Sequence, residues 1–263
     1  MEKFIRWTAW TMQTPKAYGA FHLTFSIVGM VVVVLTAWFL RKLNNKQNRI
    51  LLLCIGLFLA LFEVYKLLFY YFVIGGGRFV WWVFPFQLCS VPMYLCIFCG
   101  LCKIEKVNNW MYEFVFSFSF LTGVLPLFEP SGINHPYVML TLHAYTWHLI
   151  LAFLGLYLFF SKRAGNSKGG YLKGATVFLG AVVVAQIINV CLRGRDGATM
   201  FFISPYAGTG MIIMKDIYAK FGWVANMFAY IIAMLAMSAV VYYLFYWCRI
   251  LHQKRIKKKV KDA

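Results

Sequence analysis

Long runs of apolar residues alternate with short polar segments along this chain. A run of about 20 apolar residues is long enough to cross a bilayer as a helix, at about 1.5 Å per residue. The pattern therefore predicts an all-α, polytopic membrane protein with seven transmembrane helices. The runs cover residues 19–40, 50–74, 79–102, 110–128, 138–160, 175–193 and 223–248.

The third run has two possible starting points. It begins at Phe79 if the apolar pattern alone decides, or at Pro85 if that proline marks the first turn of the helix, a position where proline is favoured. Residues 85–102 are still marginally long enough to span a membrane. Both starts stay open at this point.

Composition agrees with the pattern. Hydrophobic residues make up 62% of the 263 residues, charged residues make up 13%, and the mean hydropathy is +0.71, outside the range of soluble domains. Residues 1–18 contain Lys3, Arg6 and Lys16 and no cleavable small-residue site, so we do not expect a removed signal peptide. The expected organisation is an extracytoplasmic segment (1–18), a transmembrane domain (19–248) and a basic tail (249–263).

The formal net charge of +18 does not indicate a nucleic-acid partner, because the basic residues are divided unequally between alternate loops. The segments 41–49, 103–109, 161–174 and 249–263 together hold 17 lysines and arginines, and the segments on the other side hold 8. The positive-inside rule therefore predicts an N-terminus outside and a cytoplasmic C-terminus. The basic tail is expected to attract anionic lipid headgroups.

Several costly polar side chains lie inside the predicted spans. When depth is counted at about 1.5 Å per residue, they fall in the outer half of the membrane or near its midplane, where such residues are functional candidates. Glu63 and Lys66, three residues apart, share a helix face and can neutralise each other. A packing role and a chemical role for this pair remain equally open. The set comprises Glu63, Lys66, His143, His148, Gln186 and Asn189.

The spacing of the two histidines in the 138–160 run disfavours a metal site on this pair. They are five residues apart, so on an ideal helix they diverge by about 140° and cannot chelate one ion as an i, i+4 pair does. No metal and no other cofactor is expected from the sequence.

Most of the seven cysteines lie in apolar segments, and their number is odd, which argues against a disulfide framework. The spacing of Cys96, Cys99 and Cys102 fits a redox or iron–sulfur motif, but no fourth ligand lies nearby. Buried cysteines commonly act as small hydrophobic residues, and we interpret this run in that way.

Cys89 has a different neighbourhood, between Pro85 and Pro92. If a helix starts at Pro85, the thiol lies near its N-terminus, where the helix dipole favours a thiolate. Pro92 removes a helical hydrogen bond and leaves irregular backbone that needs a polar or protein-lined setting. A cysteine becomes a nucleophile when a histidine accepts its proton. His148 is the expected partner, with His143 and Gln87 as possible orienting groups.

Four motifs of the chain carry a family resemblance: residues 85–90 (PFQLCS), 121–125 (LTGVL) before Glu129 and Pro130, 143–148 and 154–157 (LGLY). They resemble the YwaF-type bacterial integral membrane proteins, and the likeness covers roughly residues 63–230. Glu63 and Asn189 also lie where that family has an acid and an amide. The sequence departs from the family pattern at Phe86, where leucine is common, and around residues 197–200.

The resemblance implies an activity. Eukaryotic relatives of the family include a transmembrane acyltransferase that uses a cysteine and a histidine on ether lysophospholipids, and more distant relatives are the androgen-induced membrane hydrolases. When the functional residues of these relatives are matched to this sequence position by position, the resemblance implies that Cys89 is the nucleophile, that His148 is the base and that the substrates are membrane lipids. His143 matches a second histidine of the bacterial pattern. The expected location is a bacterial cell membrane rather than the endoplasmic reticulum.

The sequence thus favours a lipid acyltransferase or acyl hydrolase that works through an acyl-thioester on Cys89. Glu63, Lys66, Gln87, Gln186 and Asn189 are then expected to place headgroups and stabilise charge. A transporter or channel is the rival hypothesis, since the same layer of Glu, Lys and His side chains suits a solute or proton path. A third hypothesis is a partner protein whose buried polar residues only hold the helices together.

Overall fold

A computed structural model describes residues 1–261 of the chain. All regular elements in this range are helical, and the β pairing within it is a single bridge between Thr11 and Tyr137. The all-α prediction is therefore confirmed. The α-helices are α1 (Glu2–Trp7), α2 (Ala20–Leu40), α3 (Asn45–Phe69), α4 (Val91–Leu101), α5 (Glu105–Phe114), α6 (Phe120–Phe128), α7 (Val138–Phe160), α8 (Gly170–Leu192) and α9 (Met214–Lys261).

Short π- and 3-10 turns connect or extend these helices. A π-turn, η1 (Tyr70–Ile74), continues α3, and another, η3 (Val115–Ser119), joins α5 to α6 into one long helix. The remaining short turns are 3-10 helices, namely η2 (Trp81–Val83), η4 (Pro130–Gly132), η5 (Arg195–Gly197) and η6 (Met200–Phe202).

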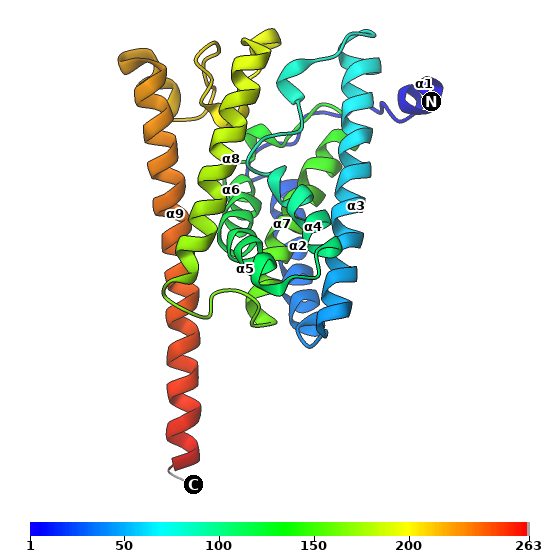
Figure 1. Cartoon of the computed structure of the whole chain (residues 1–263). Coiled ribbons are helices and arrows are strands. Elements are labelled where there is room, and N and C mark those ends of the chain that lie inside the picture. The colour runs from blue at the N-terminus through cyan, green and yellow to red at the C-terminus, as the bar shows by residue number, and fades with distance from the viewer. Residues whose placement is uncertain (262–263) are drawn as a thin grey trace.

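Among the described residues, six helices rather than seven are long and apolar enough to cross a membrane. They are Ala20–Leu40, Asn45–Ile74, Glu105–Phe128, Val138–Phe160, Gly170–Leu192 and Met214–Lys259. These six helices match six of the predicted runs, so the prediction of a polytopic membrane protein is confirmed, whereas the predicted number of seven spans is not. Figure 1 shows the two ends of the chain at opposite ends of the bundle. Which end faces the cytoplasm stays a prediction.

The predicted membrane-spanning helix at residues 79–102 is not present in the structure, which has a shorter helix there. Its α-helical part is α4, which has 11 residues and a length of about 16 Å. Pro92 lies in the first turn of α4, and it can neither donate to the carbonyl of Leu88 nor avoid that carbonyl sterically. The helix therefore starts at Val91, later than both expected starts, and residues 84–90 form turns.

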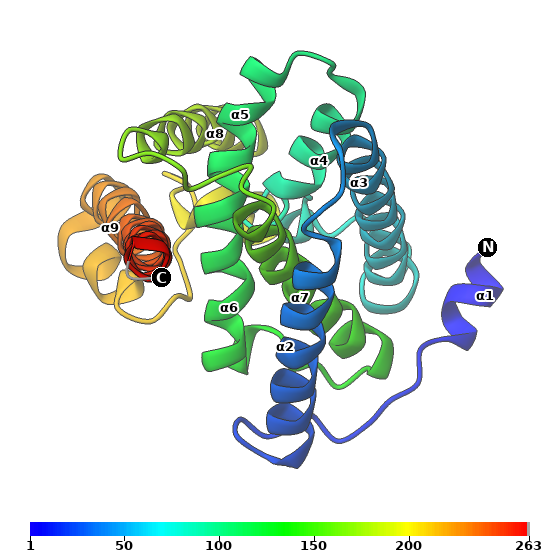
Figure 2. The same ribbon diagram turned by 90° about the horizontal axis from the view of Figure 1, so that it is seen from below.

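The centre of the bundle is α7. Every residue from 151 to 158 is buried, and α7 contacts α2, α3, α6 and η3. Figure 2 shows α7 in the middle, with α8 and α9 on one side and α2 at the edge. In contrast, α2 buries His22, Val33 and Ala37 alone, so most of its surface faces the surrounding membrane.

Two glycines let α6 and η3 approach α7 closely. A Cβ atom at Gly123 would lie 2.5 Å from the amide nitrogen of Ala152, and one at Gly155 would lie 2.6 Å from Cβ of Phe120. Small residues at such crossings are typical of membrane helix packing, because they allow backbones to come together.

We expect Gly123→Ala to destabilise the protein by about 1–3 kcal/mol, because the new methyl group forces α6 away from α7. The measurement is thermal unfolding in detergent, followed by circular dichroism. Gly180→Ala in α8 is the matched control, since a Cβ atom there meets no atom within 4 Å. Equal melting temperatures for the two variants would contradict this view of the α6–α7 contact.

Candidate functional site

The turns at residues 84–90 are held by side chains from other parts of the bundle. Backbone that is not helical needs such partners at membrane depth, because hydrocarbon offers none. Tyr94 Oη donates to the carbonyl of Pro85 at 2.7 Å. Trp147 Nε1, from α7, donates to the carbonyl of Cys89 at 3.0 Å. These bonds position Cys89 directly before the N-terminus of α4 and against α7.

Gln87 connects this segment to a second irregular one, the 198–204 loop. Its Nε2 donates to the carbonyl of Thr199 at 2.8 Å, and its Oε1 accepts from the backbone N–H of Phe201 at 2.9 Å. The side-chain amide therefore replaces the backbone partner that a helix or strand would supply. Gln87 was predicted as an orienting group, and the structure places its amide on the protein backbone.

Two asparagines hold the same loop from other helices. Asn189 of α8 accepts from the N–H of Met200 at 2.6 Å and donates to the carbonyl of Met200 at 3.1 Å, and Asn226 of α9 donates to the carbonyl of Phe202 at 2.7 Å. Gln186 contacts this group by accepting from Asn189 Nδ2 at 3.3 Å. We call Gln87, Asn189 and Asn226 the amide cluster. It fixes a loop that the backbone alone cannot stabilise.

The loop held by the amide cluster is strained. Phe201 and Phe202 have φ values of 54° and 59°, a left-handed conformation that costs roughly 1–3 kcal/mol for each such residue. Phe201 is fully buried, and its ring stacks on Phe86 at a centroid distance of 5.9 Å. The aromatic contact and the amide hydrogen bonds together offset the strain.

Cys89 is half-buried and has charged neighbours. Glu63 and Lys66 of α3 both lie close enough for their charges to act on its sulfur. They form an ion pair with 2.6 Å between Lys66 Nζ and Glu63 Oε1, and Glu63 is buried. Tyr230 of α9 is also buried, and Cys89 lies within electrostatic range of its hydroxyl. The expected pairing of Glu63 with Lys66 is thus present, and its charges reach the thiol.

The two histidines of α7 face different neighbours. His148 Nδ1 lies 2.9 Å from the carbonyl oxygen of Thr122 on α6. A carbonyl only accepts, so the neutral imidazole carries its proton on Nδ1 and leaves the Nε2 lone pair free. His143 lies on the α3 side, with its ring 4.3 Å from that of Phe62 and 5.5 Å from that of Trp147.

The structure brings some predicted residues together and leaves others apart. Glu63 and Lys66 form an ion pair whose charges reach Cys89, and the charge of Lys66 also reaches His143. Across residues 1–261, no hydrogen bond joins Cys89 Sγ to either imidazole, and His143 Nε2 is buried without a hydrogen-bond partner. Catalytic hydrogen bonds often form only when substrate binds.

Sequence reasoning missed Trp147 and Tyr230. Trp147 carries a sequence signal, because an indole N–H buried in a membrane span needs an acceptor. Tyr230 carries none, since it is one of several tyrosines in a long apolar helix. Cys96 and Cys99, from the predicted cysteine run, are buried in the hydrophobic core, and the described part of the chain contains no cluster of three metal-binding side chains.

His135 lies outside the spans, in the loop before α7, and the charge of Lys66 reaches it. Burial and, secondarily, Lys66 lower the pKa of the His135 imidazole below its usual value. The folded protein therefore keeps this group neutral where the unfolded chain already binds a proton. The resulting stability is complete above about pH 6.5, the ordinary histidine pKa, and is lost as the pH falls below it.

We expect the melting temperature to fall between about pH 7.5 and pH 5.5, and to fall less in His135→Gln. The measurement is thermal unfolding in detergent at several pH values. His252→Gln, on the exposed end of α9, is the control and should follow the wild-type curve. A His135→Gln curve parallel to wild type would remove His135 from this pH dependence.

Comparison with known protein families identifies a family for this chain. The model of the TMEM164 family matches residues 17–246, which include all the site residues described above. No curated protein matches the chain. No solved structure matches it either.

Proposed function

This chain belongs to the TMEM164 family of transmembrane proteins, and on that premise we propose that it is an integral membrane enzyme acting on lipid acyl chains. Cys89 is the nucleophile and His148 is the base. The observation that carries the proposal is the hydrogen bond from His148 Nδ1 to the carbonyl of Thr122 at 2.9 Å. It orients the imidazole and leaves Nε2 as a proton acceptor, as a base next to a nucleophile requires.

The position of Trp147 supports the pairing. Its indole holds the carbonyl of Cys89 at 3.0 Å, and His148 is the next residue along α7. The bond therefore keeps the cysteine-containing turn against the part of α7 that carries the base.

The proposed reaction has two stages. The thiol proton passes to His148 Nε2, and the thiolate attacks the ester carbonyl carbon of a lipid. The C–O bond breaks, the leaving alkoxide takes the proton from His148, and an acyl-thioester remains on Cys89. A hydroxyl of a lysolipid, or water, then gives its proton to His148 and attacks the thioester, and the cysteine sulfur is released and reprotonated.

The start of α4 supports charge stabilisation during both stages. The first N–H groups of a helix have no partner within the helix, and α4 begins at Val91, two residues after Cys89. Pro92 has no N–H and the N–H of Met93 donates to the carbonyl of Ser90 at 3.2 Å, so the N–H of Val91 is the donor proposed for the oxyanion of a tetrahedral intermediate. The Glu63–Lys66 pair, whose charges reach the sulfur, supplies charge for a lipid headgroup. These steps use only groups of the chain itself.

We expect Cys89→Ala to abolish thioester labelling by a fluorescent acyl probe in membranes, because the attacking sulfur is gone. His148→Gln should lower the labelling rate by roughly 10²–10⁴-fold, the usual contribution of a general base. The readouts are in-gel fluorescence and mass spectrometry of membrane lipids. Cys191→Ala is the control, since that cysteine is exposed on α8. Unchanged labelling in both site variants would end the enzyme proposal.

A proton or solute path is a second candidate, favoured by the buried Glu63–Lys66 pair and the unpartnered Nε2 of His143. It predicts that proteoliposomes acidify on an imposed potential and that Glu63→Gln removes most of the flux. The readout is an entrapped pH dye, with Glu2→Gln on the exposed α1 as control. If the protein is instead an enzyme, neither Glu63→Gln nor Glu2→Gln shows a proton flux.

The basic end of α9 is proposed to bind anionic headgroups of a bacterial cell membrane. Figure 1 shows α9 continuing past the other helices at the C-terminal end, and residues 251–259 are exposed. Arg249 belongs to the bundle, because it donates to the carbonyls of Ala164 and Gly165 at 2.9 Å. Residues 262 and 263 of the predicted tail lie outside the described residues.

A further inference from the structure

A long apolar groove runs along the membrane face of α2, and we propose that it binds one acyl chain of the lipid substrate, with the carboxyl end of the chain toward Cys89. The identity of the lipid as substrate depends on the proposed function. The presence of a bound chain does not depend on it, and the test below separates the two.

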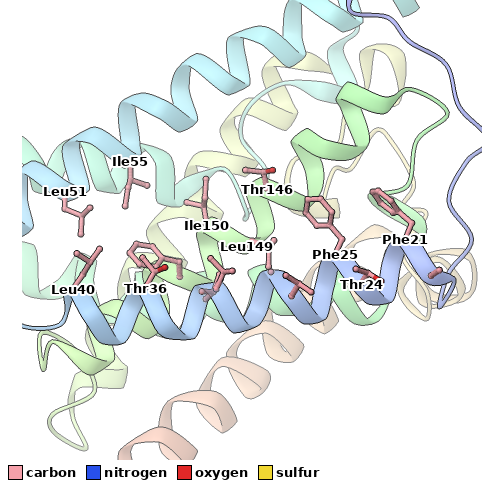
Figure 3. A pocket seen from close by; sticks show the side chains of 16 residues that line it. Phe21, Thr24, Phe25, Thr36, Leu40, Leu51, Ile55, Thr146, Leu149 and Ile150 are labelled. Atoms are coloured by element: carbon pink, nitrogen blue, oxygen red, sulfur yellow. The ribbon is translucent and has the colours of Figure 1, made fainter.

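The groove lies between α2, α3 and α7 and has a volume of about 890 Å³. Figure 3 shows Leu149 and Ile150 of α7 at its base, with Thr36 on α2 and Ile55 on α3 along its sides. Its lining on α2 runs from Ala20 to Leu40, which is about 30 Å at 1.5 Å per residue. That length equals the hydrocarbon thickness of a bilayer, which the acyl chains of two leaflets fill together, so one acyl chain fits within the groove.

The residues that line the groove favour a hydrocarbon chain over water. None of its 16 residues is charged, and its polar side chains are the hydroxyls of Thr24, Thr36 and Thr146, which a helix can satisfy through its own carbonyls. Water needs two to four polar partners to stay in a cavity, and the groove does not supply them. An empty groove would lose the dispersion contacts of its walls. Its three helices are all membrane-spanning segments, so the surrounding hydrocarbon supplies the occupant.

The groove leads toward the candidate site. Its α7 lining includes Thr146, Ile150 and Phe153, and His143 continues the same helix face one turn earlier. On α3, Leu51 and Ile55 line the groove, and Phe62 continues that face to its stacking contact with His143 at 4.3 Å. Trp147, whose ring lies 5.5 Å from that of His143, donates to the carbonyl of Cys89. The His143–Phe62 pair therefore stands between the groove and Cys89, and the proposal places the carboxyl end of the chain at this pair.

The test uses phosphatidylcholine with a diazirine near the end of one acyl chain, in nanodiscs that hold the whole protein. After irradiation, peptide mass spectrometry should find adducts concentrated on the groove residues of α2 and α7. Thr36→Trp should lower these adducts about tenfold, which corresponds to about 1.4 kcal/mol of binding free energy, because the indole fills the groove. Leu35→Trp is the matched control, since Leu35 faces the other side of α2.

A second pair, Val32→Trp and its control Val31→Trp, guards against a folding defect in one variant, and unfolding temperatures are measured for all four. Adducts spread evenly over all lipid-facing helices, or equal adduct levels in the groove and control variants, would overturn the groove proposal. Groove adducts that persist in Cys89→Ala support a bound chain even if the acyl-transfer assay fails. Acyl transfer without groove adducts would contradict the groove proposal but not the enzyme proposal.

Discussion

The need to satisfy backbone hydrogen bonds inside the membrane determines how this site is built. Pro92 cannot donate to the carbonyl of Leu88 and is too bulky to approach it, and α4 starts at Val91. Residues 84–90 therefore present carbonyl groups without helical partners, and hydrocarbon offers none. Tyr94 donates to the carbonyl of Pro85 and Trp147 donates to that of Cys89, which holds Cys89 between α4 and α7. Gln87 of the same segment pairs instead with the backbone of the 198–204 loop.

The requirement extends to the 198–204 loop, which pairs with the same segment. The amide cluster binds backbone atoms of Thr199, Phe201, Met200 and Phe202 from three separate elements. An aromatic stack then runs from Phe86 through Phe201 and Phe178 to Phe118, and it joins the two irregular segments to the packed core. Two segments that would be unstable alone are thus rigid together, and a rigid support is what a preorganised site needs.

The spans of this protein can be predicted from its sequence because length and apolarity decide them. The i, i+3 pairing of Glu63 with Lys66 and the divergence of His143 from His148 also follow from helical geometry alone. The third span was wrong because its bounds were taken from apolarity, which is the same for a helix and for the irregular segment that precedes Pro92. The partners of Gln87 and Asn189 lie 112 and 11 residues away in an irregular loop, and no local pattern predicts such contacts.

The location of Cys89 explains why this thiol, rather than any of the other six, suits nucleophilic chemistry. Cys96 and Cys99 are fixed inside the core, and Cys54, Cys191 and Cys248 are exposed on helices that face the membrane. Cys102 ends α4 at the opposite end from Cys89. Within the described residues, Cys89 combines a non-helical backbone, partial burial and an ion pair whose charges reach its sulfur. The start of α4 at Val91 leaves Cys89 outside the helix, and the hydrogen bond from Trp147 ties its carbonyl to α7.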